Sequence, residues 1–558
     1  MPLPVRTVPT TPFEGQKPGT SGLRKRVVVF QQDRYTENFV QAIFTAMPAP
    51  GPRGATLVVG GDGRYFMTEA VQKIVRIGAA NGVARFIIGQ NGILSTPAAS
   101  ALIRSRQADG GIILTASHNP GGPQNDFGIK YNTRNGGPAP ESVTDAIYEA
   151  TCTISEYVEA DLGAPIDLAT IGTQSFDGLE VEVVDSVEDY VALTKSIFDL
   201  ELIRSFCAAN PKFTMLFDAL NGVTGPYGRR IFVDELGFPE SSLDQCTPLE
   251  DFGGSHPDPN LTYAHKLVER VASEKVALGA ASDGDGDRNM VLSHDWFVTP
   301  SDSVALIAHH AAACIPYFKR NGINGLARSM PTSCAIDRVA AAKGLPVFEV
   351  PTGWKFFGNL MDAGRLSICG EESFGTGSDH IREKDGIWAV VAWLNIIAHV
   401  NQTTPGASVR SIMLDFFKAY GRNYFTRYDY EEVDADGAAK MMARLRALAA
   451  GEDGGLVGRS YSGYTVAKVD DFEYTDPVDQ SVSSKQGLRI IFADSSRIIF
   501  RLSGTGSEGA TVRIYIERYD PMQFELDTQA ALKPLVHAAL DISQLEAYTG
   551  RKDPTVIT

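Results

Sequence analysis

The sequence has no apolar run long enough to cross a lipid bilayer. Its most apolar stretch, GIWAVVAWLNIIAHV (386–400), is short and interrupted, whereas a spanning helix needs about 20 apolar residues. We expect this stretch to form a buried helix. The first residues, MPLPVRTVPTTPFEGQKPGTSG (1–22), lack the apolar segment of a secretion signal. The sequence therefore predicts a protein without stable membrane insertion.

Cysteine is scarce, and the cysteines that occur lie far apart. No pair has the Cys-x-x-Cys spacing or the spacing to histidine that is typical of a metal site. The pattern argues against a disulfide framework and favours reduced thiols in a cytoplasmic protein. The six cysteines are Cys152, Cys207, Cys246, Cys314, Cys334 and Cys369.

Positive charge is also in short supply. The chain has 51 Lys and Arg against 67 Asp and Glu, which gives a formal net charge of −16. Such an acidic chain argues against a nucleic-acid partner. An anionic ligand has to be held by a local group of cations that works against the overall field.

What the chain does have is enough apolar residues for several cores, 43% of 558 residues. A chain of this length predicts about three to five domains. Three segments have the same succession of features: an apolar strand, a loop of small residues, a helix and a glycine. They are residues 56–89, 213–238 and 324–350. This order predicts three related α/β domains with mixed, mainly parallel sheets.

The sequence changes character near residue 406. A helical segment, DGAAKMMARLRALAAGEDG, precedes alternating apolar segments, and ADSS between two of them is typical of a hairpin turn. We expect a C-terminal α+β domain with an antiparallel sheet, reached through a linker at 401–408. The predicted domains are 1–190, 191–303, 304–405 and 406–558.

The strongest chemical signal is the stretch ASDGDGDRN, in which Asp283, Asp285 and Asp287 alternate with glycines after an apolar run. In an extended chain the three carboxylates face one side. Their mutual repulsion is relieved by a hard dication, which predicts one Mg²⁺ per chain. An EF-hand is excluded because Arg288 and His294 stand where that loop needs Gly and Glu.

A second loop, RLSGTGSEGATVR (501–513), predicts phosphate binding. Its glycines and small hydroxyl residues allow backbone N–H groups to approach an anion, and Arg513 adds charge. Gly504, Gly506 and Gly509 spell the dinucleotide fingerprint. That fingerprint needs a helix to follow, whereas TVRIYIE predicts a strand, so we reject dinucleotide binding. A plain hairpin loop is the alternative.

A third loop, CGEESFGTGSDHIREKDG (369–386), combines an acidic stretch with cations. In an extended loop Glu371 and Ser373 project to one side and can hold sugar hydroxyls, with Arg382 and Lys384 nearby. A solvated acidic loop is an equally good interpretation of this stretch alone. The stretch PTGWKFFG is similarly ambiguous between core packing and ligand contact.

The stretch TASHNPGG (115–122) places Ser117 beside His118, a pairing that suggests a serine hydrolase. Neighbouring side chains in an extended segment point apart, so His118 is poorly placed as a base for Ser117. No Gly-x-Ser-x-Gly elbow occurs, and no acid–histidine pair is identifiable for a triad. Beside a metal loop and an anion loop, Ser117 is better interpreted as a carrier of a phosphoryl group.

Four motifs carry a family resemblance: TASHNPGG, DGDGDR, GEESFGTGSDH and SGTGSEGAT, in this order along the chain. Together with KPGTSGLRKRV, NDFGIKYN, RSMPTS and PTGWKFFG, they resemble the α-D-phosphohexomutase superfamily, and within it the eukaryotic-type phosphoglucomutases. The resemblance covers almost the whole chain. It implies four domains around a deep central cleft, each contributing one loop.

The resemblance also implies roles for individual residues. Ser117 is the phosphoserine and shares the Mg²⁺ with the three aspartates. His118 and Lys384 are candidates for proton handling, and Arg24 and Arg288 assist Lys384 near the reacting phosphate. The residues implied to bind the sugar hydroxyls are Thr352, Gly353, Glu371 and Ser373. The residues implied to bind the phosphate far from the reaction are Ser503, Thr505, Gly506, Ser507 and Arg513.

The reaction implied is the interconversion of glucose 1-phosphate and glucose 6-phosphate, with glucose 1,6-bisphosphate as intermediate and activator. A phosphohexomutase for mannose or glucosamine phosphates and a non-catalytic paralogue are the alternatives. Sugar phosphates are the expected partners of a cytoplasmic monomer or homodimer. Two positions depart from the expected pattern, Glu508 in the phosphate loop and Gln480 where a glycine is expected.

Overall fold

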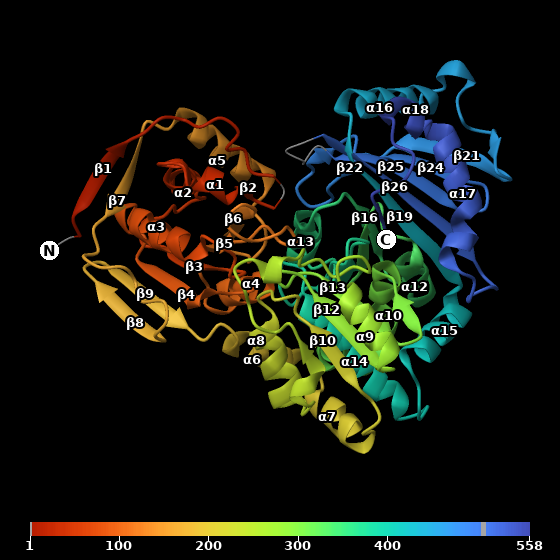
Figure 1. The fold of residues 1–558 in the computed structure, drawn as a ribbon, viewed down its shortest axis with the longest axis horizontal. Helices are drawn as coiled ribbons and strands as arrows, with labels where there is room; N and C mark the ends of the chain where they lie inside the picture. The colour runs from red at the N-terminus through yellow and green to blue at the C-terminus, as the bar shows by residue number, and fades with distance from the viewer. Residues whose placement is uncertain (1–2, 20, 504–508) are drawn as a thin grey trace.

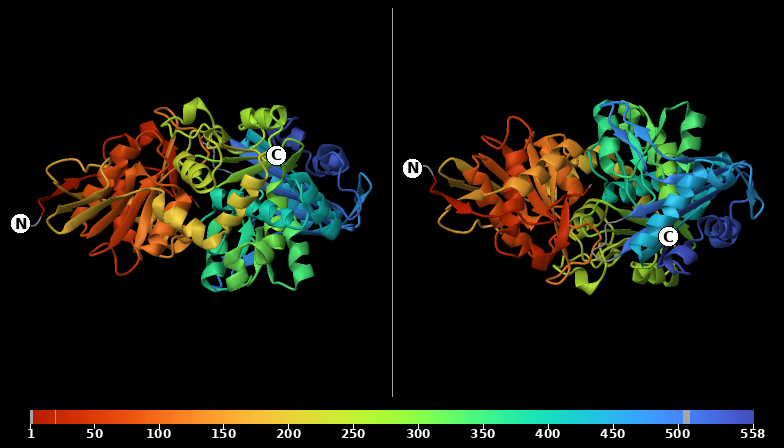
Figure 2. Two further views of the ribbon diagram at one scale, coloured as in Figure 1. Left: turned by 90° about the horizontal axis from the view of Figure 1, so that it is seen from below. Right: turned by 90° about the horizontal axis from the view of Figure 1, so that it is seen from above.

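The computed structural model describes residues 3–19, 21–503 and 509–558. Four β-sheets, each with its own helices, follow one another along the chain (Figure 1). The N-terminal sheet forms one end of an elongated molecule, and the other three sheets are grouped at the opposite end, as both views of Figure 2 show.

The N-terminal sheet has seven strands in the order β2-β6-β5-β3-β4-β9-β8. Its centre is parallel, and β2, β6 and β8 run antiparallel to their neighbours. The strands are β2 (Leu23–Arg26), β3 (Thr56–Gly61), β4 (Arg85–Ile93), β5 (Gly110–Leu114), β6 (Asp126–Thr133), β8 (Gly172–Phe176) and β9 (Leu179–Val184). Around it lie α1 (Val27–Phe30), α2 (Tyr35–Ala46), α3 (Met67–Ala80), α4 (Thr96–Ser105), α5 (Glu141–Thr153) and the pair β1 (Val5–Pro9) and β7 (Glu156–Ala160).

The second sheet has the order β11-β10-β12-β13-β14, with β10 parallel to both of its neighbours. Its strands are β10 (Met215–Asp218), β11 (Leu243–Asp244), β12 (Leu278–Ser282), β13 (Asn289–Ser293) and β14 (Trp296–Val298). The helices are α6 (Glu188–Ile197), α7 (Leu200–Ala209), α8 (Gly225–Gly228), η1 (Arg229–Glu235), η2 (Glu240–Ser242), η3 (Phe252–Gly254) and α9 (His265–Ser273).

The third sheet has the order β16-β15-β17-β18, with β15 parallel to β16 and β17. Its strands are β15 (Leu326–Ser329), β16 (Val347–Val350), β17 (Ile368–Gly370) and β18 (Thr376–Ser378). The helices are α10 (Pro300–Cys314), α11 (Pro316–Asn321), α12 (Ala335–Lys343), α13 (Trp354–Asp362), α14 (Gly386–Asn401) and α15 (Val409–Tyr420).

The C-terminal sheet is antiparallel, in the order β20-β21-β24-β25-β26-β19-β27. Its strands are β19 (Arg422–Val433), β20 (Ser460–Tyr461), β21 (Tyr464–Asp471), β24 (Leu488–Phe492), β25 (Arg497–Ser503), β26 (Ala510–Asp520) and β27 (Val556–Ile557). The pair β22 (Tyr474–Thr475) and β23 (Val482–Ser483) stands apart from it, and the helices are α16 (Ala435–Ala449), η4 (Glu452–Gly454), α17 (Thr528–Ser543) and α18 (Leu545–Thr549).

The predicted fold class is confirmed in its main features. The first and third predicted repeats are the units β3-α3-β4 and β15-α12-β16, each with a parallel strand pair. In the second repeat the chain passes from α8 into the π-helix η1 before β11. The ADSS turn joins the antiparallel strands β24 and β25. Three α/β units and a C-terminal α+β unit therefore follow from the sequence pattern.

The predicted linker at 401–408 forms an ordered turn between α14 and α15. Asn401 and Gly406 close a tight turn, and the Ser408 side chain caps α15. The apolar face of α15 lies in the same hydrophobic core as α10, α12 and α14. The C-terminal sheet has a separate core and begins after Gly421, which has a φ of +77°. Residues 409–420 therefore pack with the helices α10, α12 and α14 and not with the core of the C-terminal sheet.

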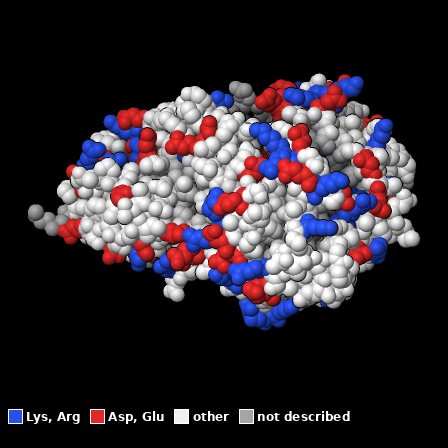
Figure 3. All heavy atoms as spheres, turned by 60° about the horizontal axis from the view of Figure 1, so that its bottom comes forward, with Lys and Arg blue, Asp and Glu red and all other residues white. Residues whose placement is uncertain are grey.

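The apolar run at 386–400 forms the buried helix α14, as predicted, and Trp388 and Trp393 on it are almost fully enclosed. Within the described ranges, no helix has both the length and the apolarity to span a membrane. On the surface, Lys and Arg lie interspersed with Asp and Glu across the face shown in Figure 3. All six cysteines are free thiols.

Two helical glycines offer a test of the packing. A Cβ atom on Gly225, at the start of α8, would overlap the backbone carbonyl of Cys246 next to β11, whereas one on Gly358 in α13 meets nothing within 4 Å. We expect Gly225→Ala to destabilise the protein by about 1–3 kcal/mol. Gly358→Ala should stabilise it by about 0.5–1 kcal/mol, because alanine favours the helix. Denaturant unfolding of both variants measures the difference, and equal stabilities would contradict the packing.

Candidate active site

Three carboxylates meet in the turn that follows β12. One carboxylate oxygen from each of Asp283, Asp285 and Asp287 lies within 4.8 Å of the others, and all three side chains are buried. The sequence predicted this convergence from an extended chain, but the segment is a turn. Gly286 adopts a φ of +83°, and its N–H donates to the carbonyl of Asp283 at 3.1 Å. A left-handed glycine therefore brings the carboxylates together.

The carboxylates fit a hard divalent cation. Oδ1 of Asp285 and Oδ1 of Asp287 are buried and have no hydrogen-bond partner among the described residues. Burial and the two neighbouring carboxylates raise the pKa of Asp283 well above its usual value. Buried, unpaired acceptors facing one another are costly without a cation, and an all-oxygen donor set is the kind that Mg²⁺ prefers.

Neighbouring elements fix the orientation of each aspartate. Thr96, at the start of α4, donates through Oγ1 to Oδ2 of Asp285 at 2.7 Å. Lys384 Nζ lies 3.3 Å from Oδ2 of Asp287. Burial acts to lower the pKa of Lys384, but Asp287 and other acidic neighbours outweigh it and raise the pKa. Lys384 is therefore a charged partner of the carboxylate cluster.

Ser117 lies directly against this cluster. Its hydroxyl donates to Oδ2 of Asp283 at 3.0 Å, although 166 residues separate the two in sequence. The side chain of Ser117 also lies 3.3 Å from Nδ1 of His118. The expectation that these two side chains point apart was wrong, because Ser117 has a φ of +55° and is not extended. A strained conformation of this kind is typical of functional sites.

A buried ion pair supports the serine turn from behind. Arg64 and Asp62 are both fully buried and bonded to each other, and Arg64 donates to the carbonyl of Ser117 at 2.9 Å. Thr115 accepts from the N–H of Ser117 at 2.7 Å and donates to Asp62 at 2.6 Å. Motif reading missed Arg64 and Asp62, because they precede the serine motif by more than fifty residues.

Cations from several elements surround the serine. Burial lowers the pKa of His118 well below its ordinary value, and the charges of Arg288, Arg24, Lys384 and Arg513 add to this effect. Both effects disfavour the charged form of His118. Burial lowers the pKa of Arg24, although Asp285 opposes the shift. The structure thus brings together the cations that the sequence placed near the reacting phosphate.

The predicted sugar loop is joined directly to the metal loop. Arg288 and Gly375 form a β-bridge, and the N–H of Asn289 donates to the carbonyl of Phe374 at 2.9 Å. Phe374 has a φ of +69°, so this segment is a turn and not the extended loop that was expected. Burial raises the pKa of Glu371, whose Oε1 accepts the N–H of Gly353 at 3.2 Å.

Thr352 lies at the junction with the C-terminal sheet. Its hydroxyl accepts from Arg501 at 2.7 Å. Arg501 is the first residue of the predicted phosphate loop (501–513) but was not singled out from the sequence. Ser373 is half-buried in the same turn as Glu371.

Of the predicted phosphate-loop residues, Ser503 ends β25 and Arg513 lies 3.7 Å from Asp429. Thr505, Gly506, Ser507 and the departure at Glu508 lie outside the described residues. A strand, β26, follows the loop, as expected when dinucleotide binding was rejected. The other departure, Gln480, has a φ of +62°, a conformation that suits the glycine expected there.

The structure contains a serine–histidine–aspartate series that was not identified from the sequence. Ser378 lies 2.6 Å from Nδ1 of His380, whose Nε2 lies 2.9 Å from Asp385. The two side chains of the ion pair are 1% exposed, and Ser378 is 0% exposed. A hydrolase needs a nucleophile that substrate can reach, so this buried series is structural.

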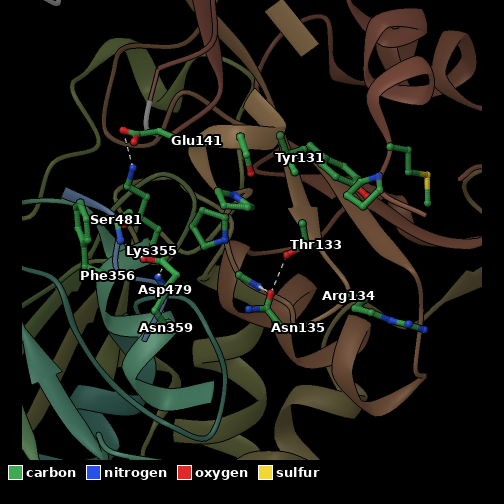
Figure 4. Close-up of a pocket in the computed structure, with 18 of the residues that line it drawn as sticks. Tyr131, Thr133, Arg134, Asn135, Glu141, Lys355, Phe356, Asn359, Asp479 and Ser481 are labelled. Atoms are coloured by element: carbon green, nitrogen blue, oxygen red, sulfur yellow. Dashed lines mark hydrogen bonds and ion pairs between the residues drawn. The ribbon is translucent and has the colours of Figure 1, made fainter. Parts of the chain in front are cut away.

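A separate cavity of about 610 Å³ lies beside the site, between β6, α13 and the loop before β23 (Figure 4). Lys355 crosses its edge to Glu141 at 2.7 Å, and Asn359 bonds Asp479 at 3.2 Å. Among the described residues that line it, none is a predicted site residue. The cavity marks the junction of three structural units and is distinct from the carboxylate cluster.

Comparison with known proteins gives this arrangement a family. The phosphoglucomutase of Schizosaccharomyces pombe is 60% identical over 99% of this chain and 100% of its own length. That of Emericella nidulans is 57% identical over the full length of both. The chain belongs to the phosphoglucomutase family. Relatives named cytoplasmic and chloroplastic phosphoglucomutases from Arabidopsis thaliana are 58% and 57% identical.

Solved structures and family profiles agree with this assignment. The Paramecium phosphoprotein pp63/parafusin, a phosphoglucomutase in an open form, matches with a TM-score of 0.91 and 49% identity over all of both chains. A phosphomannomutase-like structure from Thermus thermophilus shares the fold at 21% identity and a TM-score of 0.68. The phosphoglucomutase/phosphomannomutase domains I, II and III match 15–158, 188–296 and 300–420, and the C-terminal domain of phosphoglucomutase-1 matches 422–555.

The packing between the sugar loop and Lys384 gives a test of the site. A Cβ atom on Gly375 would overlap Cδ of Lys384. We expect Gly375→Ala to displace the ammonium from Asp287 and to lower kcat by about tenfold, which is about 1.4 kcal/mol of transition-state stabilisation. The melting temperature should change little, because a flexible side chain can move. Gly358→Ala is the matched control, and equal kcat values for the two variants would contradict this role of Lys384.

Proposed function

We propose that the protein interconverts glucose 1-phosphate and glucose 6-phosphate through a phosphoserine at Ser117. The observation that carries the proposal is the 3.0 Å hydrogen bond from Ser117 to Asp283, inside a carboxylate cluster with cations around it. A serine oxygen, a divalent-cation site and several arginines are the parts that phosphoryl transfer requires.

In the first half-reaction the phosphoryl group passes from Oγ of Ser117 to the 6-hydroxyl of glucose 1-phosphate. The phosphorus–oxygen bond to Ser117 breaks as the bond to the sugar oxygen forms, which gives glucose 1,6-bisphosphate. The proton lost by the sugar hydroxyl ends on Oγ of Ser117. His118, 3.3 Å from that oxygen, is placed at the serine end of this proton movement, and Lys384 is the second candidate.

The charge that develops during transfer is balanced by this chain's own cations. The charges of Arg288, Arg24, Lys384 and Arg513 all act on the imidazole of His118 and lower its pKa. We propose that Asp283, Asp285 and Asp287 hold one Mg²⁺ together with an oxygen of the phosphorylated Ser117. When bound, this ion supplies charge neutralisation for the transferring group.

The second half-reaction returns the other phosphate to Ser117, after the bisphosphate has turned over in the cleft. We propose that Glu371, Thr352, Gly353 and Ser373 bind sugar hydroxyls that are equivalent in the two orientations. The phosphate remote from Ser117 is proposed to bind Ser503, Thr505, Gly506, Ser507 and Arg513. The contact between Arg501 and Thr352 supports a position for the distal site beside the sugar loop.

We also propose domain boundaries and a location. The first three domains follow the predicted order 1–190, 191–303 and 304 onward, and the fourth begins at Gly421 on the evidence of the two separate cores. A cytoplasmic location is proposed because relatives named cytoplasmic are 57–58% identical to this chain. A monomer and a homodimer remain the two expected states, which the solution mass distinguishes.

A mutase with another sugar preference is the alternative function. The comparison that decides between them is the kcat/KM for glucose 1-phosphate against that for mannose 1-phosphate and glucosamine 1-phosphate. The proposal requires glucose 1-phosphate to give the highest value. A higher value for either competitor would reassign the substrate and leave the phosphoserine chemistry in place.

The intact mass of the purified protein tests the phosphoserine. We expect a fraction of the protein to carry one phosphoryl group, which is lost to the sugar on addition of glucose 1-phosphate. Ser117→Ala should carry none and should have no measurable mutase activity, because no carrier remains. Ser373→Ala is the control, since it should keep the phosphoryl group and change KM. Full activity in Ser117→Ala would refute the mechanism, and a protein that never exchanges phosphate would support a non-catalytic role.

Removal of divalent cations tests the carboxylate cluster. Dialysis against a chelator should abolish turnover, and Mg²⁺ should restore it. Calorimetric titration of Asp285→Asn should show Mg²⁺ affinity reduced by more than the about 10–100-fold that loss of a supporting hydrogen bond costs, because a ligand itself is removed. Asp295→Asn, on the exposed turn after β13, is the control. Unchanged Mg²⁺ binding in Asp285→Asn would show that the metal binds at another site.

A further inference from the structure

One short segment connects three of the four structural units. The residues Arg382–Gly386, here called the connecting segment, run between β18 and α14. The N–H of Arg382 donates to Ser100 of α4 at 3.1 Å. The N–H of Gly386 donates to the carbonyl of Gly286 in the metal loop at 3.1 Å. The segment is therefore bonded to the first unit at one end and to the second unit at the other.

Lys384 stands in the middle of the connecting segment, with its stem beside Gly375. The side chain passes over Gly375 and ends 3.3 Å from Asp287. On its C-terminal side, Asp385 accepts from Tyr190 of α6 at 2.5 Å and from the N–H of Trp388 at 3.0 Å. The position of the ammonium thus depends on how the backbone on either side is held.

Glu383 provides the anchor on the N-terminal side of Lys384. Its carboxylate forms a buried ion pair with Lys130 and accepts from Asn132 at 2.8 Å, and both partners lie on β6 of the first unit. The side chains of Glu383 and Lys130 are 1% and 8% exposed. A buried, doubly bonded carboxylate has few alternative positions, because leaving its partners exposes unpaired charge to an apolar interior.

Glu383 and Lys384 are consecutive residues that contact opposite sides. One side chain binds the sheet that carries the serine turn, and the other binds the metal loop. We propose that Glu383 is a positioning residue, which fixes the distance of Lys384 from the carboxylate cluster by tying the connecting segment to Lys130 and Asn132. This inference rests on the proposed function, since its effect is on the proposed phosphoryl transfer.

Loss of the anchor has a second consequence. Lys130 acts through its charge on Asp285, and in Glu383→Gln it loses its buried counter-ion. The freed ammonium then acts on Asp285 without its counter-ion and competes with a divalent cation for that carboxylate. Glu383→Gln should therefore weaken Mg²⁺ binding as well as displace Lys384.

The matched control is Glu517, a buried carboxylate that is likewise paired with a cation and an asparagine and that also accepts from the N–H of Cys334. It is buried on β26, paired with Arg497, and it accepts from Asn423 at 2.6 Å. Glu383→Gln and Glu517→Gln remove the same charge from the same kind of ion pair. Both are expected to lower the melting temperature, because breaking a buried pair is costly at any position. Only one of the two pairs is attached to Lys384.

The experiment measures mutase kinetics, Mg²⁺ titration and melting temperature for the wild type, E383Q, E383D and E517Q. We expect E383Q to lose about 10–100-fold in kcat, the range for groups that orient a catalytic partner. KM for glucose 1-phosphate should change far less, and the Mg²⁺ concentration for half activation should rise. E383D keeps the charge on a shorter stem and should fall between E383Q and the wild type. E517Q should keep wild-type kcat and Mg²⁺ dependence.

The outcomes separate this inference from the proposed function. An active wild type together with wild-type kcat in E383Q would overturn the positioning role and leave the function standing. Equal losses of kcat in E383Q and E517Q would overturn it as well, since the effect would then be general destabilisation. If E383Q does not fold, wild-type kcat in E383D overturns the inference and a reduced kcat with raised Mg²⁺ requirement supports it. A wild type without mutase activity would refute the proposed function itself.

Discussion

The structure depends on one electrostatic problem, the burial of three carboxylates within 4.8 Å of one another. Their repulsion is opposed by charged groups from other parts of the chain, with Lys384 at Asp287 and Arg288 between Asp283 and Asp258. The three carboxylates fit a divalent cation, which would complete the balance. In a chain with a net charge of −16 this local concentration of cations is what allows an anionic substrate to be held.

Each unit of the fold contributes to that balance through the end of a strand or the turn after it. The metal turn follows β12, and the serine turn follows β5 in the first sheet. Backbone bonds then join the turns to one another, as between Asn289 and Phe374 or between Gly386 and Gly286. These backbone bonds set the positions of the turns relative to one another, and the position of a side chain such as Lys384 depends on them.

The third and fourth units are joined mainly through side chains. α15 belongs to the same hydrophobic core as the helices of the third unit. Ion pairs from Arg489 and Arg497 of the C-terminal sheet to Glu349 of β16 join the two units. A paired and hydrogen-bonded buried charge cannot leave its partner without a large desolvation cost. The two units are therefore held together through side chains that sequence patterns do not reveal.

The sequence by itself determined the fold class, because strand, helix and turn patterns depend on local periodicity, and it located Ser117, the aspartates and Lys384 within recognisable motifs. It could not determine how these motifs meet. The expected extended loops are turns, since Ser117, Gly286 and Phe374 adopt positive φ values that neighbouring elements impose. Supporting residues such as Arg64 and Glu383 carry no motif of their own. Only the tertiary structure brings them to their partners, because a buried charge is stabilised by the groups that pack against it.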